Sequence, residues 1–162
     1  MAVSLALFHR QLADALVVRG DDMLIQNVYS GATERYQRAL WFDPGSVVAI
    51  DRLVFVALQQ RTPGALRSAT ALASGYLSTH RTNPTLLFDR ALCYLRLKNY
   101  QLAYMDFSRA AQLTGDPEQY TFAGWAARRA GRQHQAWALW RRALRMRHGY
   151  RPAVAALGEL RH

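Results

Sequence analysis

The sequence lacks the features that mark a secreted or membrane-spanning protein. Cys93 is the only cysteine among 162 residues, so no intramolecular disulfide can form and a reducing compartment is expected. No apolar run reaches the roughly 18–20 residues that span a membrane. The opening segment MAVSLALFHRQLADAL has no basic stretch before its apolar part, which favours a helix over a secretion signal. These absences predict a cytoplasmic location.

Motifs for catalysis and metal binding are also missing. No strand pattern stands out, no Gly-rich phosphate loop follows a strand, and no G-x-S-x-G occurs. The histidines have no partner at ligand spacing: His9, His80, His134, His148 and His162. Asp21 and Asp22 form a carboxylate pair, but they lie on an expected helix, where an ion pair with an arginine of a neighbouring helix is the stronger interpretation. The sequence predicts no enzymatic activity, no metal and no cofactor.

Acidic residues are few, and lysine is almost absent. The chain has 20 Arg, one Lys and 11 Asp and Glu, which gives a formal net charge of +10. The imbalance grows toward the C-terminus, where the segment 117–162 carries nine Arg against only Glu118 and Glu159. This half is expected to attract acidic partners. Richness in Arg and Ala is typical of a GC-rich genome and suggests a bacterial source.

What the sequence does contain is a succession of apolar segments of helical length. Short breaks rich in Pro, Gly, Asn and Asp separate them. Pro44, Pro84, Pro117 and Pro152 fall just before or at the start of segments, where a helix tolerates proline. The apolar neighbours of Cys93 predict that its thiol is buried. We expect helices over 3–26, 29–42, 46–60, 64–80, 84–98, 100–113, 117–130, 133–147 and 152–161.

Three stretches share one spacing of small and aromatic residues. A Gly or Ala is followed after twelve residues by Ala, after four more by an aromatic residue, and after three more by Ala. The three sets are Gly20–Ala32–Tyr36–Ala39, Ala91–Ala103–Phe107–Ala110 and Gly124–Ala136–Trp140–Ala143. Small residues let two helices approach closely, and the ring fills the remaining gap. One such pair leaves apolar surface uncovered, so pairs are expected to stack.

The pattern resembles the tetratricopeptide repeat, whose signature runs W-x2-L-G-x2-Y, then A-x3-F, then A and P. The copies read LVVRGDDM…ATERYQRALWFDP, LFDRALCY…AYMDFSRAAQL and YTFAGWAA…AWALWRRAL. The resemblance implies an all-α, right-handed α-solenoid forming a single domain over 1–162. Its repeats span about 13–46, 47–83, 84–116 and 117–150, with a capping helix at 152–161. The second repeat departs from the pattern, because its turn is about three residues longer and Ala73 replaces the aromatic residue.

Such repeats bind peptides or protein surfaces, so the resemblance implies a non-catalytic adaptor or chaperone-like module. Its first helices would line a groove that holds a peptide segment or helix of a partner protein. Projection of one helix face gives the groove residues Val17, Asp21, Leu24, Asp51, Phe55, Leu58, Phe88, Leu92, Leu95, Thr121, Trp125 and Arg128. The alternative for Phe55, Phe88 and Trp125 is packing between neighbouring repeats.

A basic patch near the C-terminus suggests a second function. Its members are Arg128, Arg129, Arg132, Arg141, Arg142, Arg145 and Arg147, interleaved with Trp125, Trp137 and Trp140. Guanidinium groups bind phosphate and aromatic rings stack on bases, so nucleic-acid binding is the alternative hypothesis. An acidic protein or membrane surface, or a plain solvated face, explains the same residues. Self-association through an open end of the stack is a further hypothesis.

Overall fold

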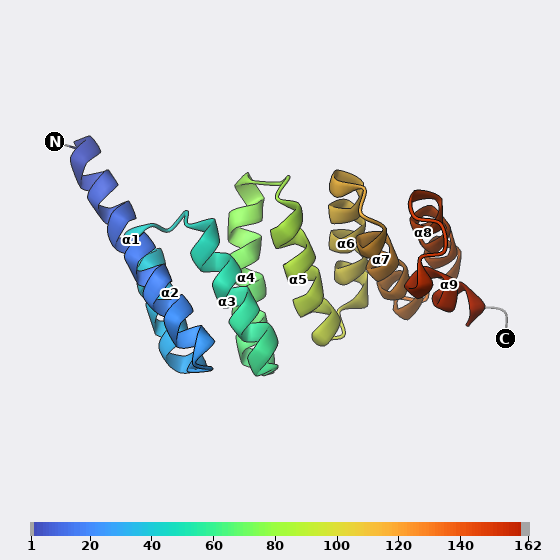
Figure 1. The fold of residues 1–162 in the computed structure, drawn as a ribbon, viewed down its shortest axis with the longest axis horizontal. Coiled ribbons are helices and arrows are strands. Elements are labelled where there is room, and N and C mark those ends of the chain that lie inside the picture. The colour runs from blue at the N-terminus through green and yellow to red at the C-terminus, as the bar shows by residue number, and fades with distance from the viewer. Residues whose placement is uncertain (1, 160–162) are drawn as a thin grey trace. The chain divides into compact units, whose positions relative to one another are not determined.

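A computed structural model describes residues 2–159 of the chain and the side chains of 4–159. This part of the chain is built from helices and contains no strand (Figure 1). The helices are α1 (Ala2–Ile25), α2 (Tyr29–Phe42), α3 (Val47–Gln60), α4 (Pro63–Thr79), α5 (Pro84–Arg96), α6 (Tyr100–Thr114), α7 (Pro117–Arg129), α8 (Gln133–Met146) and α9 (Arg151–Gly158).

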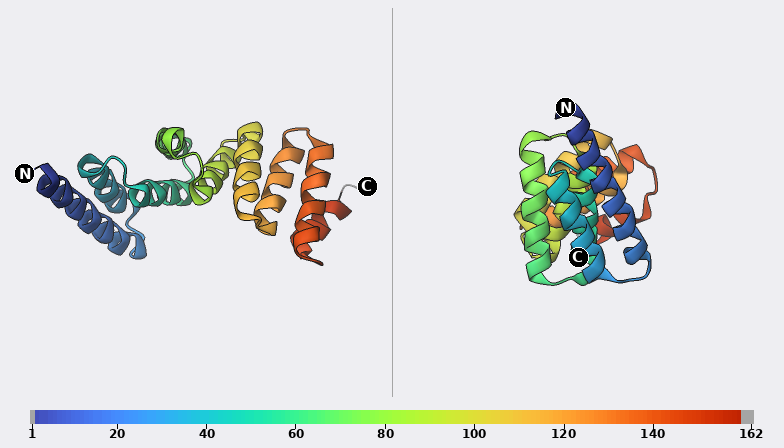
Figure 2. Two further views of the ribbon diagram at one scale, coloured as in Figure 1. Left: turned by 90° about the horizontal axis from the view of Figure 1, so that it is seen from above. Right: turned by 90° about the vertical axis from the view of Figure 1, so that its left-hand side faces the viewer.

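The chain divides into two compact units, unit 1 (residues 1–76) and unit 2 (residues 77–162), and the boundary falls within α4. In unit 2, α5 packs on α6, α6 on α7 and α7 on α8, and these helices lie side by side in both views (Figures 1 and 2). The predicted helical class is confirmed. The single domain and the four repeat ranges stay predictions.

Side-chain caps mark the starts of α3, α5 and α7, at Ser46, Asn83 and Asp116. The side chain of Ser46 accepts a hydrogen bond from Ala49 N, and that of Asn83 accepts one from Leu86 N at 3.0 Å. Asp116 Oδ1 accepts from Glu118 N at 2.8 Å. Each cap satisfies one of the amides that the first helical turn leaves without a partner.

Three turns between paired helices share one backbone form. Asn27, Lys98 and Gly131 each have a positive φ, and each lies seven residues after the small residue that starts the spacing. In each turn the next amide reaches back to the carbonyl five residues earlier at 2.8 Å, as in the pair Asn99 N and Tyr94 O. This is the hydrogen-bond pattern of a Schellman motif. First and second helix are therefore joined by the same type of turn in three repeats.

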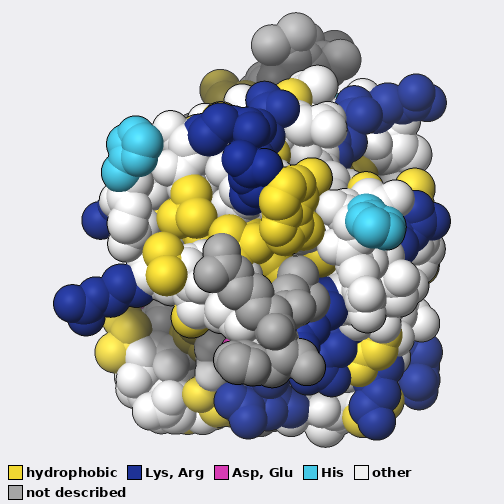
Figure 3. All heavy atoms as spheres, turned by 90° about the vertical axis from the view of Figure 1, so that its right-hand side faces the viewer, with side chains coloured by type: hydrophobic (Ala, Val, Ile, Leu, Met, Phe, Trp, Pro, Cys, Tyr) yellow, Lys and Arg dark blue, Asp and Glu magenta, His cyan; other side chains and the backbone are white. Residues whose placement is uncertain are grey.

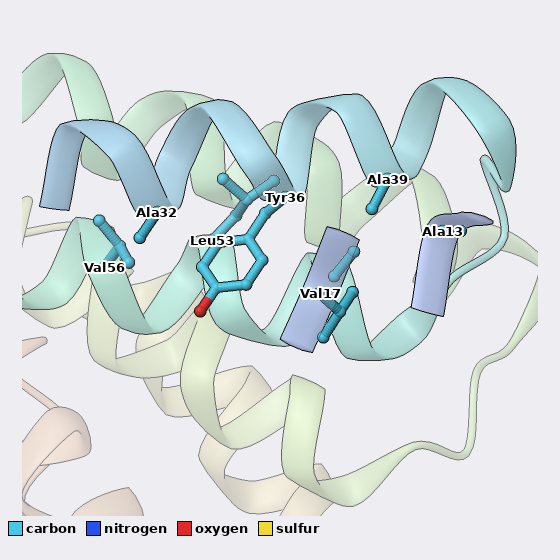
Figure 4. Close-up of a cluster of buried hydrophobic side chains, with 8 residues drawn as sticks. Ala13, Val17, Ala32, Tyr36, Ala39, Leu53 and Val56 are labelled. Atoms are coloured by element: carbon cyan, nitrogen blue, oxygen red, sulfur yellow. The ribbon is translucent and has the colours of Figure 1, made fainter. Parts of the chain in front are cut away.

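In unit 1 the ring of Tyr36 fills the gap left by Gly20. A Cβ atom built at Gly20 would lie 2.9 Å from Cδ1 and Cζ of Tyr36, which is too close for a side chain. Tyr36 is fully buried and lies among Val17, Leu53 and Val56 (Figure 4). A glycine is therefore required here because the aromatic ring occupies the space of any side chain.

Unit 2 repeats this packing twice. Phe107 is buried against Ala91 and Ala103, and Trp140 is buried in the gap at Gly124. A Cβ atom at Gly124 would lie 2.7 Å from Cε2 of Trp140. The predicted small–aromatic–small packing is confirmed in both units, because Tyr36, Phe107 and Trp140 are all fully buried.

The second repeat is built differently, as its sequence suggests. The aromatic position follows the small residue by 16 residues in the other repeats. Counting back seven residues from Arg61, which has a positive φ, places Val54 at the first position, 19 residues before Ala73. Both side chains are fully buried. In this repeat the larger of the two residues, Val54, therefore lies on the first helix. The boundary between the two units falls in the same repeat.

Candidate functional site

A hollow of about 650 Å³ opens in unit 2 beside its first helices. Six residues from α5, the start of α6, α7 and the C-cap of α9 line it: Leu95, Tyr100, Trp125, Arg128, Arg129 and Glu159. On the C-terminal face of the molecule, exposed hydrophobic side chains lie beside Lys and Arg side chains (Figure 3). The lining of the hollow combines the apolar side chains of Leu95 and Trp125, which we call its floor, with the basic ones of Arg128 and Arg129, which we call its edge.

A chain of aromatic contacts positions the floor. Phe88 contacts Phe107 and Phe122 with ring centroids 5.1 and 5.3 Å apart, and Phe122 contacts Trp125 edge to face at 5.2 Å. Phe107 belongs to the buried core, whereas Trp125 is 37% exposed. Trp125 is thus an accessible ring in contact with the half-buried Phe122, which in turn contacts the buried Phe107. A ring supported in this way has the geometry of an apolar anchor point.

The two arginines at the edge differ in their partners. Arg128 Nη1 forms an ion pair with Glu159 Oε2 at 2.6 Å. Arg129 is exposed and has no acidic partner within the described residues. The charge of Arg128 is therefore balanced by Glu159, whereas no acidic group of the described residues balances that of Arg129.

Unit 2 contains six of the predicted groove residues. Leu95, Trp125 and Arg128 line the hollow. Phe88 and Leu92 are half-buried and pack against the cluster around Phe107, which is the packing role that the sequence left open for Phe88.

Thr121 does not line the hollow, because it is only 1% exposed. Its hydroxyl donates to Pro117 O at 2.8 Å, and its carbonyl accepts from Trp140 Nε1 at 3.1 Å. The hydroxyl and the carbonyl of Thr121 therefore both form hydrogen bonds within unit 2.

The other six predicted groove residues belong to unit 1. Phe55 is exposed, Leu24 and Leu58 are half-buried, and Val17 belongs to the core. Asp51 is half-buried, and its Oδ2 lies 3.4 Å from Nη1 of its neighbour Arg52. A groove that includes residues of both units stays a prediction.

Asp21 has a structural role in unit 1. Its Oδ1 accepts hydrogen bonds from the hydroxyl of Tyr36 at 2.7 Å and from Arg52 Nε at 2.8 Å. Burial, and then the hydrogen bond to Asp21, raise the pKa of the Tyr36 hydroxyl. The interpretation of Asp21 as an ion-pair partner of an arginine on a neighbouring helix is confirmed, since Arg52 lies on α3.

The predicted basic patch spreads over several elements of unit 2. Arg128 and Arg129 line the hollow, and Arg132 donates to Gln101 Oε1 at 2.8 Å. Arginines of the patch also lie over aromatic rings: Arg132 over Tyr104, Arg141 over Trp137, Arg142 over Tyr120 and Arg147 over Tyr150. Arg145 is exposed on α8. Binding of nucleic acid by these residues stays a prediction.

Two lining residues, Tyr100 and Glu159, were not among the predicted site residues. Tyr100 begins the second helix of its pair and Glu159 follows α9, so neither lies on the projected face of a first helix. The signal for Glu159 is compositional, because it is the only acidic residue after Glu118. An acid in so basic a segment is a candidate partner for one of the arginines.

A second hollow, of about 470 Å³, lies in unit 1 near the N-terminus. It is lined by Ala6, His9, Arg10, Phe42, Asp43 and Gly45.

No group of His, Cys, Asp and Glu suited to a metal ion occurs among the residues that the structure describes. None of the helices in that part combines the length and hydropathy needed to cross a membrane.

Comparison with known proteins defines the fold. No family model and no curated protein matches the chain. The solved structure of MamA protein matches with a TM-score of 0.81 at 17% identity, covering 92% of this chain and 80% of that one. YrrB, titled a TPR protein with an unusual peptide-binding site, matches with a TM-score of 0.76 at 15% identity, covering 90% and 74%.

A tetratricopeptide repeat protein from Parabacteroides merdae ATCC 43184 matches with a TM-score of 0.78 at 20% identity, covering 93% of this chain and 59% of that one. Identities this low establish the fold alone. The tetratricopeptide-repeat fold predicted from the sequence is thereby confirmed.

Proposed function

We propose that this chain, which has the tetratricopeptide-repeat fold, is a non-catalytic protein-interaction module. Its unit 2 hollow binds a segment of a partner protein that carries an apolar side chain next to an acidic one. The observation that carries the proposal is Trp125, an accessible ring supported by the aromatic contacts of Phe122 and Phe107. Arg129, which has no acidic partner in the described part of the chain, lines the same hollow.

The chemistry of the lining specifies the ligand. Leu95 and Trp125 offer apolar surface that gains free energy when a ligand side chain removes it from water. Arg129 offers a planar donor pair, which fits a carboxylate through charge-assisted hydrogen bonds. A hydrophobic residue followed within a few positions by Asp or Glu satisfies both groups.

The fold supports a role in binding. The repeat packing places first helices beside the hollow, and the structurally similar YrrB is titled as having a peptide-binding site. Fold similarity at 15% identity does not transfer that site, so the proposal depends on the lining residues of this chain. A cytoplasmic location and a bacterial source stay predictions from the sequence.

A random peptide library displayed on phage tests the proposal. Selection against the full chain is expected to enrich peptides with Leu, Phe or Trp close to Asp or Glu. A synthetic copy of an enriched peptide should bind Trp125→Ala and Arg129→Gln variants at least about tenfold more weakly, since each loses an anchor worth on the order of 1.4 kcal/mol.

Trp41→Ala is the matched control, because it removes an exposed aromatic side chain of unit 1 that is not among the predicted groove residues. It should leave the peptide affinity unchanged, and circular dichroism should show the same helix content in all variants. Equal binding by the parent chain and the folded Trp125→Ala variant would contradict the proposal.

A further inference from the structure

One face of α8 carries a stripe of exposed residues that belong to none of the buried core clusters. Its members, at spacings of three and four residues, are His134, Trp137, Arg141 and Arg145, which we call the α8 stripe. The opposite face holds Ala136, Trp140 and Ala143, which are fully buried. Trp137 is 47% exposed.

The corresponding helices α2 and α6 carry other residues at the positions of this stripe. Aligned on Tyr36, α2 presents Ser30, Thr33, Gln37 and Trp41 at the same four positions. Aligned on Phe107, α6 presents Gln101, Tyr104, Ser108 and Gln112. Tyr104 is half-buried and packs against the core clusters of unit 2, whereas Trp137 at the same position of α8 is exposed. Neither α2 nor α6 has a charged residue at these positions, so Arg141 and Arg145 distinguish α8 from both helices.

The position of Arg141 in the stripe favours the binding of an anion. The guanidinium carbon of Arg141 lies 4.5 Å from the ring centroid of Trp137, one turn earlier on the same helix. This cation–π contact restricts the arginine before a ligand arrives, which lowers the entropy cost of binding. Neither Arg141 nor Arg145 has an acidic partner in the described part of the chain.

We propose that the α8 stripe docks an acidic amphipathic helix of a partner protein. Arg141 and Arg145 are one helical turn apart, and Glu or Asp residues spaced i,i+4 on a facing helix have the same separation. An apolar residue on that face of the partner covers the exposed part of the Trp137 ring. The surface is separate from the hollow, whose lining contains no residue of α8.

Two observations favour a protein helix over nucleic acid. Arg141 already covers one face of Trp137, which is the surface that a base would stack on. The stripe also follows one helix, whereas binding of a single strand commonly uses a basic groove lined with aromatic side chains. A partner helix, by contrast, needs only a single row of contacts in which apolar and charged side chains alternate.

Fluorescence anisotropy with three labelled probes tests this proposal on the full chain. The first probe is an 18-residue alanine-based helix with Glu at i,i+4 spacing and Leu on the same face. The second has the same composition with its Glu residues distributed around the helix. The third is a 20-nucleotide single-stranded oligonucleotide. The first probe should bind at least about tenfold more tightly than the second, and binding should weaken as salt rises.

The double variant Arg141→Gln/Arg145→Gln should weaken binding of the first probe by about tenfold or more. The charge-matched control Arg38→Gln/Arg67→Gln removes two exposed arginines of unit 1 and should change it less than about threefold. Trp137→Ala should weaken it by about threefold or more, because the ring both orients Arg141 and contacts the partner.

Equal losses in the two double variants would overturn the proposal, because they would show attraction by net charge alone. The proposal also fails if the oligonucleotide binds more tightly than the first probe and loses its affinity in the stripe variant. No binding of the first probe at low salt has the same consequence. Trp125→Ala in the hollow should leave this binding intact, so failure here is distinguishable from failure of the peptide site.

Discussion

Units 1 and 2 share one type of core packing but differ in the charge of their sequences. In each, a buried ring fills the space beside a small residue of the first helix, as Tyr36 does at Gly20 and Trp140 at Gly124. Residues 1–76 carry seven Arg and no Lys against six Asp and Glu, whereas residues 77–162 carry thirteen Arg and one Lys against five. The repeat spacing thus fixes the core and leaves the outer positions free to acquire a binding function.

The polar groups inside the units differ in the same way. Asp21 of unit 1 joins Tyr36 and Arg52 in a network whose carboxylate and guanidinium are both more than one third exposed. In unit 2, Arg90 and Asp106 form a bidentate pair at 2.7 and 2.8 Å with side chains only 16% and 11% exposed. Equivalent packing therefore coexists with ion pairs of different burial, and their removal should have different costs.

Trp140→Ala should have the largest effect on stability and should separate the two units. Removing a fully buried indole leaves a cavity and costs about 3–5 kcal/mol of the free energy of unfolding. Hydrogen exchange should show lost protection in residues 117–158 and little change in residues 12–57 of unit 1. Equal loss in both units would show that the chain unfolds as one cooperative body.

The two ion pairs offer a sharper comparison. Arg90→Met leaves the carboxylate of Asp106 buried without its main partner and should cost about 3 kcal/mol. Arg52→Met removes the partner of a half-exposed carboxylate and should cost about 1 kcal/mol or less. Urea denaturation of both variants gives the two values, and a larger cost for Arg52→Met would reverse the order of burial seen in the structure.

The thiol of Cys93 is expected to have the smallest effect on stability, and its reactivity reports the opening of unit 2 alone. Burial, and then the charge of Asp89, raise the pKa of the thiol to about 12 from its usual value near 9. At pH 8 a thiol reagent should therefore react only when unit 2 opens, at a rate that rises in Trp140→Ala. Because the folded pKa is the higher one, the thiol's contribution to stability is complete below pH 9 and is lost between pH 9 and 12.

Comparison of pH titrations of the parent chain and Cys93→Ala isolates this contribution. The stability difference between the two should be constant below about pH 8 and change above pH 9. A thiol that reacts in the native chain as fast as in urea would show that Cys93 is exposed.

Much of the fold followed from the sequence because its packing rule is periodic. Apart from the end of α9, helix ends fall within two residues of the prediction. The expected helix 152–161 ends at Gly158 within the described residues, and positions 160–162 lie outside them. The helix expected over 84–98 ends at Arg96, because Lys98 adopts a positive φ that is more typical of Gly or Asn.

The candidate site was less predictable because it depends on which helices meet. Periodicity along α5 and α7 indicated Leu95, Trp125 and Arg128, which line the hollow. It could not indicate Glu159, whose place beside Arg128 depends on how α9 packs on α7. Thr121 shows the opposite limit, since helical spacing placed it one turn from Trp125 but could not show that the Trp140 indole would bond to its carbonyl.

The turn at Lys98 joins α5 to α6 and contains the only lysine of the chain, in an exposed position. An endoproteinase specific for lysine therefore has one peptide bond to cut, between residues 98 and 99. The cut separates two helices that hold each other through the buried ring of Phe107 next to Ala91. If the fragments 1–98 and 99–162 still elute together after cleavage, side-chain packing alone is enough to hold α5 and α6 in contact.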